Sequence, residues 1–274
     1  MPYDLKDVRA NSLAKGKEHR DKVLLWTYRW GWMTDESLQA LMKVQRRPGS
    51  ELCRRGVLQR VEPPRGHHAA YCINSASMTR ALELYEEDTG GAVIPYQWPQ
   101  TAVPFAALGE HQEAAQLIAI NQLNRYPGGK LTVDRELRVG AKKALPDFCI
   151  EHPKRKEWHE VELTPKYAER LFFQLQERDK SRQAGDFTKL IFWCRTAGVG
   201  RSIQNALNRE TCPEVFRRGD GKISMMPGGL RWNPKALRCV SEVVLIGEDR
   251  ETARYLGDAS GCQASLDDQV IMDL

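Results

Sequence analysis

A stretch with little periodicity divides this sequence after its first third. Residues 89–107, TGGAVIPYQWPQTAVPFAA, hold three prolines and a pair of glycines. Proline removes a backbone hydrogen-bond donor and glycine weakens helices and strands, so such a cluster is typical of a connecting loop. The sequence therefore predicts an N-terminal domain at residues 1–90, a linker at residues 91–107 and a C-terminal domain at residues 108–274.

The composition is ordinary for a globular protein, with 41% apolar and 28% charged residues. The seven cysteines are widely scattered and form no CxxC pair, which argues for reduced thiols and against a zinc site or a disulfide scaffold. No window approaches 18 uncharged apolar residues, and the first 20 residues lack the apolar segment of a secretory signal. These features predict a cytoplasmic protein that has no membrane partner.

The net charge of +5 is unevenly distributed. Residues 43–65 hold seven basic and two acidic side chains, and residues 201–240 hold eight basic and three acidic ones. The last 34 residues reverse the sign, with eight acids against two arginines. Two separate basic zones suit a polyanion such as DNA better than a uniform charge does, although solvated surfaces can show the same counts.

The predicted N-terminal domain has three helices, then a hairpin, and then a fourth helix. Apolar spacing predicts helices at residues 18–32, 34–44, 50–56 and 77–88, with Thr34 as the N-cap of the second helix and Ser37 at its third position. Alternating residues predict strands at 57–61 and 69–73, joined by the turn sequence PPRG at 63–66. This order of elements is that of a winged helix.

In a winged helix the third helix enters the major groove of DNA and the tip of the hairpin touches the backbone. Arginine suits both contacts, because its planar fork fits phosphates and guanine edges. The predicted contacts are Arg46, Arg47, Ser50, Arg54 and Arg55 around the third helix, and Arg65, His67 and His68 at the hairpin. The alternative is a winged helix that binds another protein and carries an incidental basic rim.

The C-terminal domain places acids inside expected strands. A helix is predicted at 110–120, strands at 132–138, 144–150 and 158–163, and a charged turn at 151–156. The apolar run at 189–194 predicts a further, buried strand. In WHEVELTPK (158–166), Glu160 and Glu162 share one strand face, while Val161 and Leu163 point to the core and His159 alternates away from the acids. Two carboxylates on one face need neutralisation, either by a metal ion or by solvent at an exposed edge strand.

Asp147 follows Pro146 on the neighbouring predicted strand. Carboxylates that converge from adjacent strands suit Mg²⁺ or Mn²⁺, which prefer hard oxygen ligands and keep several waters. A bound metal lowers the pKa of a water and stabilises charge on a phosphoryl oxygen. Lys166, four residues after Glu162, is placed to hold the attacking water or the charge of the transition state.

These residues resemble a known pattern. Pro146-Asp147 followed by Glu160-Val161-Glu162 and Lys166 resembles the PD-(D/E)xK nuclease pattern, with a glutamate where the pattern's lysine usually stands. His111 in a helix, LTVDRELR (131–138), LPDF (145–148) and HEVELTPKYAERL (159–171), behind a winged helix, are similar to the replication-relaxation family, which includes the MobC-type relaxases of mobilisable plasmids. The resemblance covers residues 18–195.

The resemblance implies an α+β protein with an N-terminal winged helix and an α/β restriction-endonuclease-like domain built on a mixed central sheet. By position, Asp147 and Glu160 would bind the metal, and Glu162 would be a third ligand or would stand in for the lysine. Lys166 would supply the displaced positive charge. Glu113, or Glu110, would be the helix acid that completes such a site, and His111 would be the family's helix histidine.

The implied function is metal-dependent nicking of double-stranded DNA at a plasmid origin of transfer, with an accessory mobilisation protein as a further candidate partner. One alternative is a restriction or transposon-type nuclease that cuts both strands. Another is a replication or transcription factor that binds DNA through a nuclease fold that no longer cuts. Many relaxases use a covalent tyrosine, so Tyr167 is a candidate nucleophile, although PD-(D/E)xK chemistry uses water.

Overall fold

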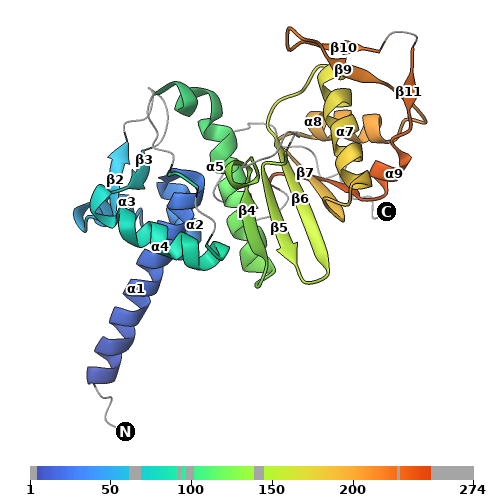
Figure 1. Ribbon diagram of the computed structural model, residues 1–274. Coiled ribbons are helices and arrows are strands. Elements are labelled where there is room, and N and C mark those ends of the chain that lie inside the picture. The colour runs from blue at the N-terminus through green and yellow to red at the C-terminus, as the bar shows by residue number, and fades with distance from the viewer. Residues whose placement is uncertain are drawn as a thin grey trace. The chain divides into compact units, whose positions relative to one another are not determined.

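The computed structural model describes residues 5–61, 69–91, 94–96, 102–138, 145–226 and 229–247, and places side chains in these ranges except at 5–13 and 102–108 (Figure 1). The chain forms two compact units, Met1–Ile120 and Asn121–Leu274. The division falls within helix α5 (Ala102–Arg125), which begins inside the predicted linker. Pro104 occupies the first turn of α5, where its missing N–H leaves no hydrogen bond unmade.

The first unit contains the predicted helices and strands in the predicted order, together with a short strand and a 3-10 helix that were not predicted. Its elements are α1 (Leu5–Trp30), β1 (Met33–Thr34), α2 (Asp35–Met42), α3 (Gly49–Arg54), β2 (Leu58–Val61), β3 (Ala70–Ile73), the 3-10 helix η1 (Ser75–Ser77) and α4 (Met78–Thr89). The three strands form an antiparallel sheet in the order β1-β3-β2. The predicted first helix starts too late, because α1 already begins at Leu5 and extends beyond the other helices of its unit (Figure 1).

Asp35 joins three elements of the first unit. Its carboxylate accepts hydrogen bonds from the backbone N–H of Gly49 and from the hydroxyl of Tyr71, each at 2.9 Å. This connects α2 to the start of α3 and to β3. A Cβ at Gly49 would lie 2.2 Å from the Tyr71 ring, so only glycine allows α3 to approach β3 this closely.

Polar side chains of α5 cover the end of α1. The Gln112 amide donates to the carbonyl of Trp30 at 2.6 Å and accepts from the Trp32 indole at 2.8 Å, and Gln116 donates to the carbonyl of Trp32 at 2.9 Å. The last carbonyls of a helix have no partner within the helix. The first part of α5 therefore completes the first unit by satisfying backbone groups that α1 leaves open.

The second unit is built on a mixed five-stranded sheet. Its strands are β4 (Lys130–Val133), β5 (Phe148–His152), β6 (Arg155–Glu162), β7 (Lys189–Cys194) and β12 (Ser241–Leu245). They lie in the order β12-β7-β6-β5-β4. Strands β4, β5 and β6 are antiparallel neighbours, whereas β6, β7 and β12 run parallel. The strand that carries Glu160 and Glu162 is therefore the central one, and the exposed edge strand considered from the sequence is excluded.

Helices cover one face of this sheet. The helices α7 (Ala168–Gln183), α8 (Ala197–Leu207) and α9 (Lys235–Arg238) share a core with Trp158, Leu190 and Phe192 on the strands. Beside α7 lies a ribbon of β9 (Val215–Arg217) and β10 (Ile223–Met225), and two shorter strands, β8 (Cys212–Pro213) and β11 (Arg231–Trp232), pair with each other (Figure 1).

The strand predicted at residues 132–138 is wrong beyond Val133. The chain turns there into the short helix α6 (Asp134–Leu137). The Glu136 carboxylate accepts from the Val133 N–H at 2.7 Å, and Arg138 pairs with Asp134 one turn away. These local contacts favour a helical turn over the extended chain that alternation of residues suggested.

The opposite face of β6 is also buried. His159 is fully buried, stacks on Phe148 with ring centroids 4.4 Å apart, and accepts a hydrogen bond at Nδ1 from the Trp193 indole at 3.0 Å. Burial lowers the pKa of His159, although the nearby Glu157 carboxylate acts in the opposite direction. His159 thus has the structural position that the alternation predicted.

Among the helices in the described ranges, none is both long and apolar enough to span a bilayer.

Candidate active site

Asp147 is held at the start of β5, next to the end of β6. Its backbone N–H donates to the carbonyl of His159 at 3.0 Å, and its side-chain Oδ2 accepts from the N–H of Val161 at 2.7 Å. The carboxyl group of Asp147 therefore lies beside Glu160, the residue between His159 and Val161 on β6. The electrostatic effect of Asp147 on Glu160 shows the same proximity.

Glu160 and Glu162 point from β6 toward α7, and both are about 5% exposed or less. The Arg178 guanidinium binds the Glu160 carboxylate, and the Lys166 ammonium binds that of Glu162. Gln174 joins the two pairs. Its amide nitrogen donates to Glu162 Oε1 at 2.7 Å and to Glu160 Oε2 at 3.2 Å, and its oxygen accepts from Lys166 Nζ at 2.7 Å.

Burial raises the pKa of Glu160 to about 7. The negative charges of Asp147 and Glu162 act in the same direction, while the charge and hydrogen bond of Arg178 oppose them. Arg178 is itself fixed, because it also donates to the carbonyl of Leu145 at 2.8 Å and lies 5.5 Å from the centre of the Trp158 ring. Glu160 consequently changes its charge in the neutral pH range.

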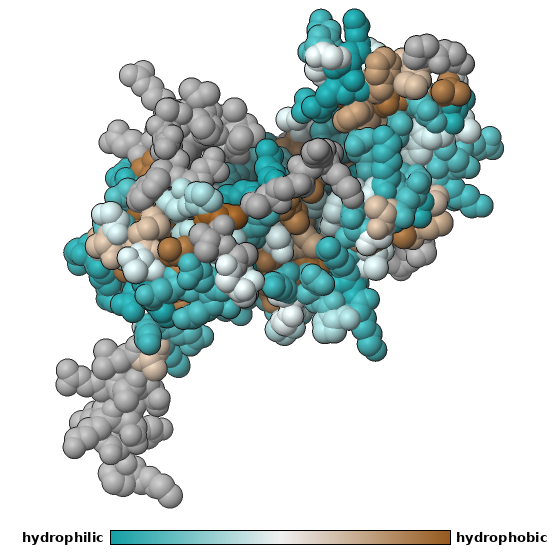
Figure 2. All heavy atoms as spheres, viewed as in Figure 1, coloured by the Kyte–Doolittle hydropathy of each residue, from teal (hydrophilic) through white to brown (hydrophobic). Residues whose placement is uncertain are grey.

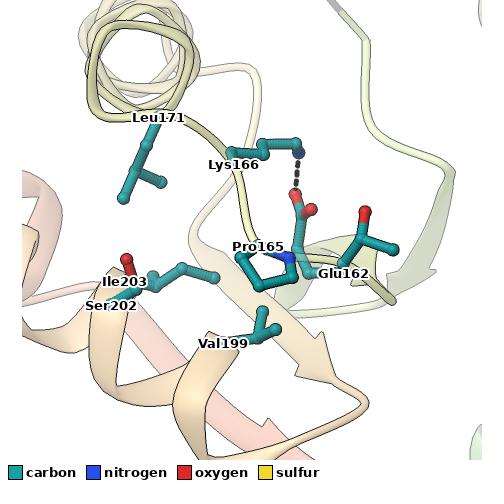
Figure 3. A pocket seen from close by; sticks show the side chains of 8 residues that line it. Glu162, Pro165, Lys166, Leu171, Val199, Ser202 and Ile203 are labelled. Atoms are coloured by element: carbon teal, nitrogen blue, oxygen red, sulfur yellow. Dashed lines mark hydrogen bonds and ion pairs between the residues drawn. The ribbon is translucent and has the colours of Figure 1, made fainter.

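A small hollow opens beside the Glu162–Lys166 pair (Figure 3). The loop after β6 contributes Thr164 and Pro165 to its wall. The remaining wall comes from α7 and α8 and consists of Leu171, Val199, Ser202 and Ile203. The ion pair therefore forms the polar side of an otherwise mostly apolar hollow.

The donor set fits a divalent cation in its chemistry. Asp147, Glu160 and Glu162 offer only carboxylate oxygens, which Mg²⁺ and Mn²⁺ prefer. In the arrangement seen here, the described residues contain no cluster of three histidine, cysteine or acidic side chains with metal-binding geometry. Arg178 and Lys166 already neutralise two of the carboxylates, so a metal must compete with these cations for Glu160 and Glu162.

The structure thus brings together four predicted residues, namely Asp147, Glu160, Glu162 and Lys166. The helix residues Glu110, His111 and Glu113 belong to the first unit. There the Thr34 hydroxyl, which also caps α2, donates to Glu113 at 2.5 Å. Their predicted part in catalysis stays a prediction.

The predicted DNA contacts lie on the surface around α3. Arg46 and Arg47 are exposed in the loop before it, and Ser50 is exposed at its start. Arg54 and Arg55 are exposed at its end, and both pair with Glu51. Arg65, His67 and His68 lie outside the described residues.

Two residues of the site were missed from the sequence, Gln174 and Arg178. They are four residues apart on α7 and lie on the side of the helix that also carries Leu171 and Leu175. Polar side chains within the apolar stripe of a helix were the available signal, because such positions face other parts of the protein.

No family model matches this sequence, and no curated protein or solved structure matches it. The function is therefore inferred from the residues and their geometry.

Proposed function

We propose that this protein is a metal-dependent DNA endonuclease that nicks double-stranded DNA, as a relaxase does at an origin of transfer. One observation carries the proposal. Asp147, just before β5, lies beside Glu160 on β6, and Glu160 shares Gln174 with the adjacent Glu162–Lys166 pair. Buried carboxylates repel one another and are costly to desolvate. Two buried carboxylates and a half-buried one at one end of a sheet are more useful to a nuclease than to a scaffold.

The arrangement of elements supports the proposal. A helix, three antiparallel strands, a helix and a parallel strand follow one another from α5 to β7, as the PD-(D/E)xK resemblance implies for such a domain. In the first unit, three helices precede an antiparallel pair of strands, which is the order of a winged helix. A nuclease domain joined to a DNA-binding module fits an enzyme that cuts at a chosen site.

Asp147 and Glu160 would hold the metal, with Glu162 as a third oxygen ligand. When bound, the metal supplies an activated water and stabilises negative charge on the phosphoryl group. Glu160 must lose its proton to bind a cation, which its pKa of about 7 allows near neutral pH. Lys166 brings a positive charge to the exposed side of the site, where it can stabilise charge on the phosphodiester.

Relaxation of supercoiled plasmid tests this proposal. With Mn²⁺ or Mg²⁺, the wild-type protein should produce open circles, and Asp147→Asn should produce none. Glu151→Gln is the matched control, because Glu151 is an exposed acid toward the far end of β5. Linear DNA as the first product would favour a nuclease that cuts both strands. Binding of the plasmid without cleavage in any divalent metal would contradict the proposal.

A DNA-binding protein without nuclease activity is the second candidate. It is favoured by the pairing of Glu160 with Arg178 and of Glu162 with Lys166, since these pairs neutralise the acids without a metal. This candidate also predicts that the first unit binds DNA. In both cases Arg54→Ala combined with Arg55→Ala should weaken DNA binding and reduce its salt dependence, and unchanged values would remove the winged helix from the proposal.

A further inference from the structure

Two exposed arginines of the second unit lie over neighbouring aromatic rings of α7. The guanidinium of Arg209, just after α8, lies 5.3 Å from the centre of the Phe172 ring. That of Arg217, at the end of β9, lies 5.3 Å from the centre of the Phe173 ring. The two phenylalanines are consecutive, so both guanidinium groups lie against the same turn of α7, on sides of the helix that are about 100° apart.

Neither arginine is neutralised by an acid. In the part of the chain that the structure describes, no carboxylate lies within ion-pair distance of Arg209 or Arg217, whereas Arg178 and Arg182 on α7 both have such partners. A guanidinium held over a ring keeps its planar fork of N–H donors available at the edge. Two such forks without counter-charges suit an anion with several oxygens, and phosphate is the common one.

A third unpaired cation extends this surface toward the acidic site. Arg170 is exposed on α7 and likewise has no ion pair among the described residues. It precedes Phe173 by three residues and Gln174 by four, so it lies one helical turn from both. Gln174 binds Lys166, Glu160 and Glu162. The cations therefore follow one another around the first turns of α7, from Arg209 over Phe172, past Arg217 over Phe173, to Arg170 beside Gln174 at the edge of the site.

The surroundings of this surface are hydrophilic. Figure 2 shows mostly hydrophilic residues where β9 and β10 reach the surface, with some apolar ones among them. The exposed apolar residues near this ribbon are Phe216, Met225 and Leu230. They are too few and too mixed with charges to form an apolar docking surface.

We infer that Arg209, Arg217 and Arg170 form a phosphate-binding ledge that holds the backbone of a DNA strand and leads it to the carboxylates. The inference rests on the proposed function, because the reacting phosphodiester belongs to the strand that the ledge would hold. It adds a contact surface in the second unit to the one proposed around α3. The ledge reads no bases, since phosphate contacts position a protein without reporting sequence.

The test compares DNA affinity at several salt concentrations, by fluorescence anisotropy of a labelled duplex with the full chain in EDTA. Arg209→Ala combined with Arg217→Ala should weaken binding at least several-fold and make the plot of log affinity against log salt shallower by roughly two, one for each lost phosphate contact. The lysine pair, Arg209→Lys with Arg217→Lys, should keep the wild-type slope and lose less affinity.

Lys130→Ala combined with Lys154→Ala is the control, because it removes the same charge from the opposite end of the sheet. If this control weakens DNA binding as much as the arginine pair does, the loss of affinity comes from the change in net charge alone, and the ledge is disproved. Wild-type affinity and slope in the arginine pair would also overturn it. These binding measurements need no cleavage of DNA. Their outcome is therefore independent of whether the protein nicks plasmid DNA. Matching circular dichroism melts establish that the variants fold.

Discussion

Glu160 and Glu162 each have a cation of their own and share Gln174. Placing an ionised carboxylate in a protein interior costs several kcal/mol unless an opposite charge and hydrogen bonds compensate. The network provides both for each glutamate, but burial still raises the pKa of Glu160 to about 7. The opposite charge of Arg178 therefore offsets only part of the cost of burying Glu160.

The raised pKa of Glu160 predicts how stability depends on pH. Between its ordinary pKa of 4.5 and about 7, the folded protein binds a proton that the unfolded chain has released, so the free energy of unfolding falls as the pH rises. The contribution of Glu160 over this range is roughly 3 kcal/mol. Glu160→Gln should flatten this decline, measured by urea unfolding from pH 5 to 8. Glu151→Gln should keep the wild-type slope, and an equally steep decline in Glu160→Gln would contradict the assignment.

Arg178→Met should destabilise the second unit more than an exposed arginine variant does. It leaves the Glu160 carboxylate buried without its cation, which costs about 3–5 kcal/mol. Arg178→Met combined with Glu160→Gln should recover much of this loss, because the unpaired charge is then removed. A double-mutant cycle from chemical unfolding measures the coupling, and simple additivity of the two changes would show that the pair does not interact.

At the scale of elements, the sequence predicted most helices and strands but not the covering of the acidic face. The strand at Lys189–Cys194 was predicted with correct bounds because it is a short, continuous apolar run. The short strands β8 to β11 were missed, since two or three residues give no detectable period. Gln174 and Arg178 were missed because they contact the glutamates only when α7 packs over β6. Local spacing in the sequence does not predict that packing.

The predicted N-cap of α2, Thr34, is confirmed. Thr34 accepts at its hydroxyl from the Ser37 N–H at 3.2 Å and donates to Glu113 at 2.5 Å. Thr34→Ala should lower the free energy of unfolding of the first unit by about 1 kcal/mol, with roughly 2 kcal/mol as the upper limit. Thr34→Ser keeps both hydrogen bonds and should lose much less. Equal losses in urea unfolding of the two variants would assign the effect to the methyl group instead.

At the scale of the whole molecule, the two units have separate tasks in the proposed function. The first unit presents the basic side chains around α3, and the second contains the carboxylates and the arginine ledge. The mixed α+β class with a mixed sheet could be anticipated from the order of elements. The charge balance of the site could not be anticipated from the sequence. It depends on Lys166, in the loop after β6, and on Arg178, on α7, which reach the acids only in the folded chain.

Metal binding should be visible in the melting temperature of the whole chain. A ligand that binds only the folded state stabilises it by about 2.7 kcal/mol at a concentration 100 times its dissociation constant. Mn²⁺ should therefore raise the melting temperature of the wild type, and more at pH 8 than at pH 6, where Glu160 keeps its proton. EDTA should reverse the shift. Asp147→Asn should show none, and an equal shift in that variant would place the metal elsewhere.

The hydrogen bond from Trp193 to His159 determines where a proton resides. An indole N–H can only donate, so Nδ1 of His159 is the unprotonated nitrogen, and the neutral ring carries its hydrogen on Nε2. That nitrogen lies 3.7 Å from Glu157 Oε2, and the same oxygen lies 3.5 Å from Nε2 of His152. Two imidazoles around a carboxylate are typical of zinc sites, but a protonated Nε2 has no lone pair to give. The Trp193 indole thereby favours the tautomer of His159 that carries its hydrogen on Nε2, on the side of Glu157, and ¹⁵N NMR of the His159 ring would show the protonated nitrogen directly.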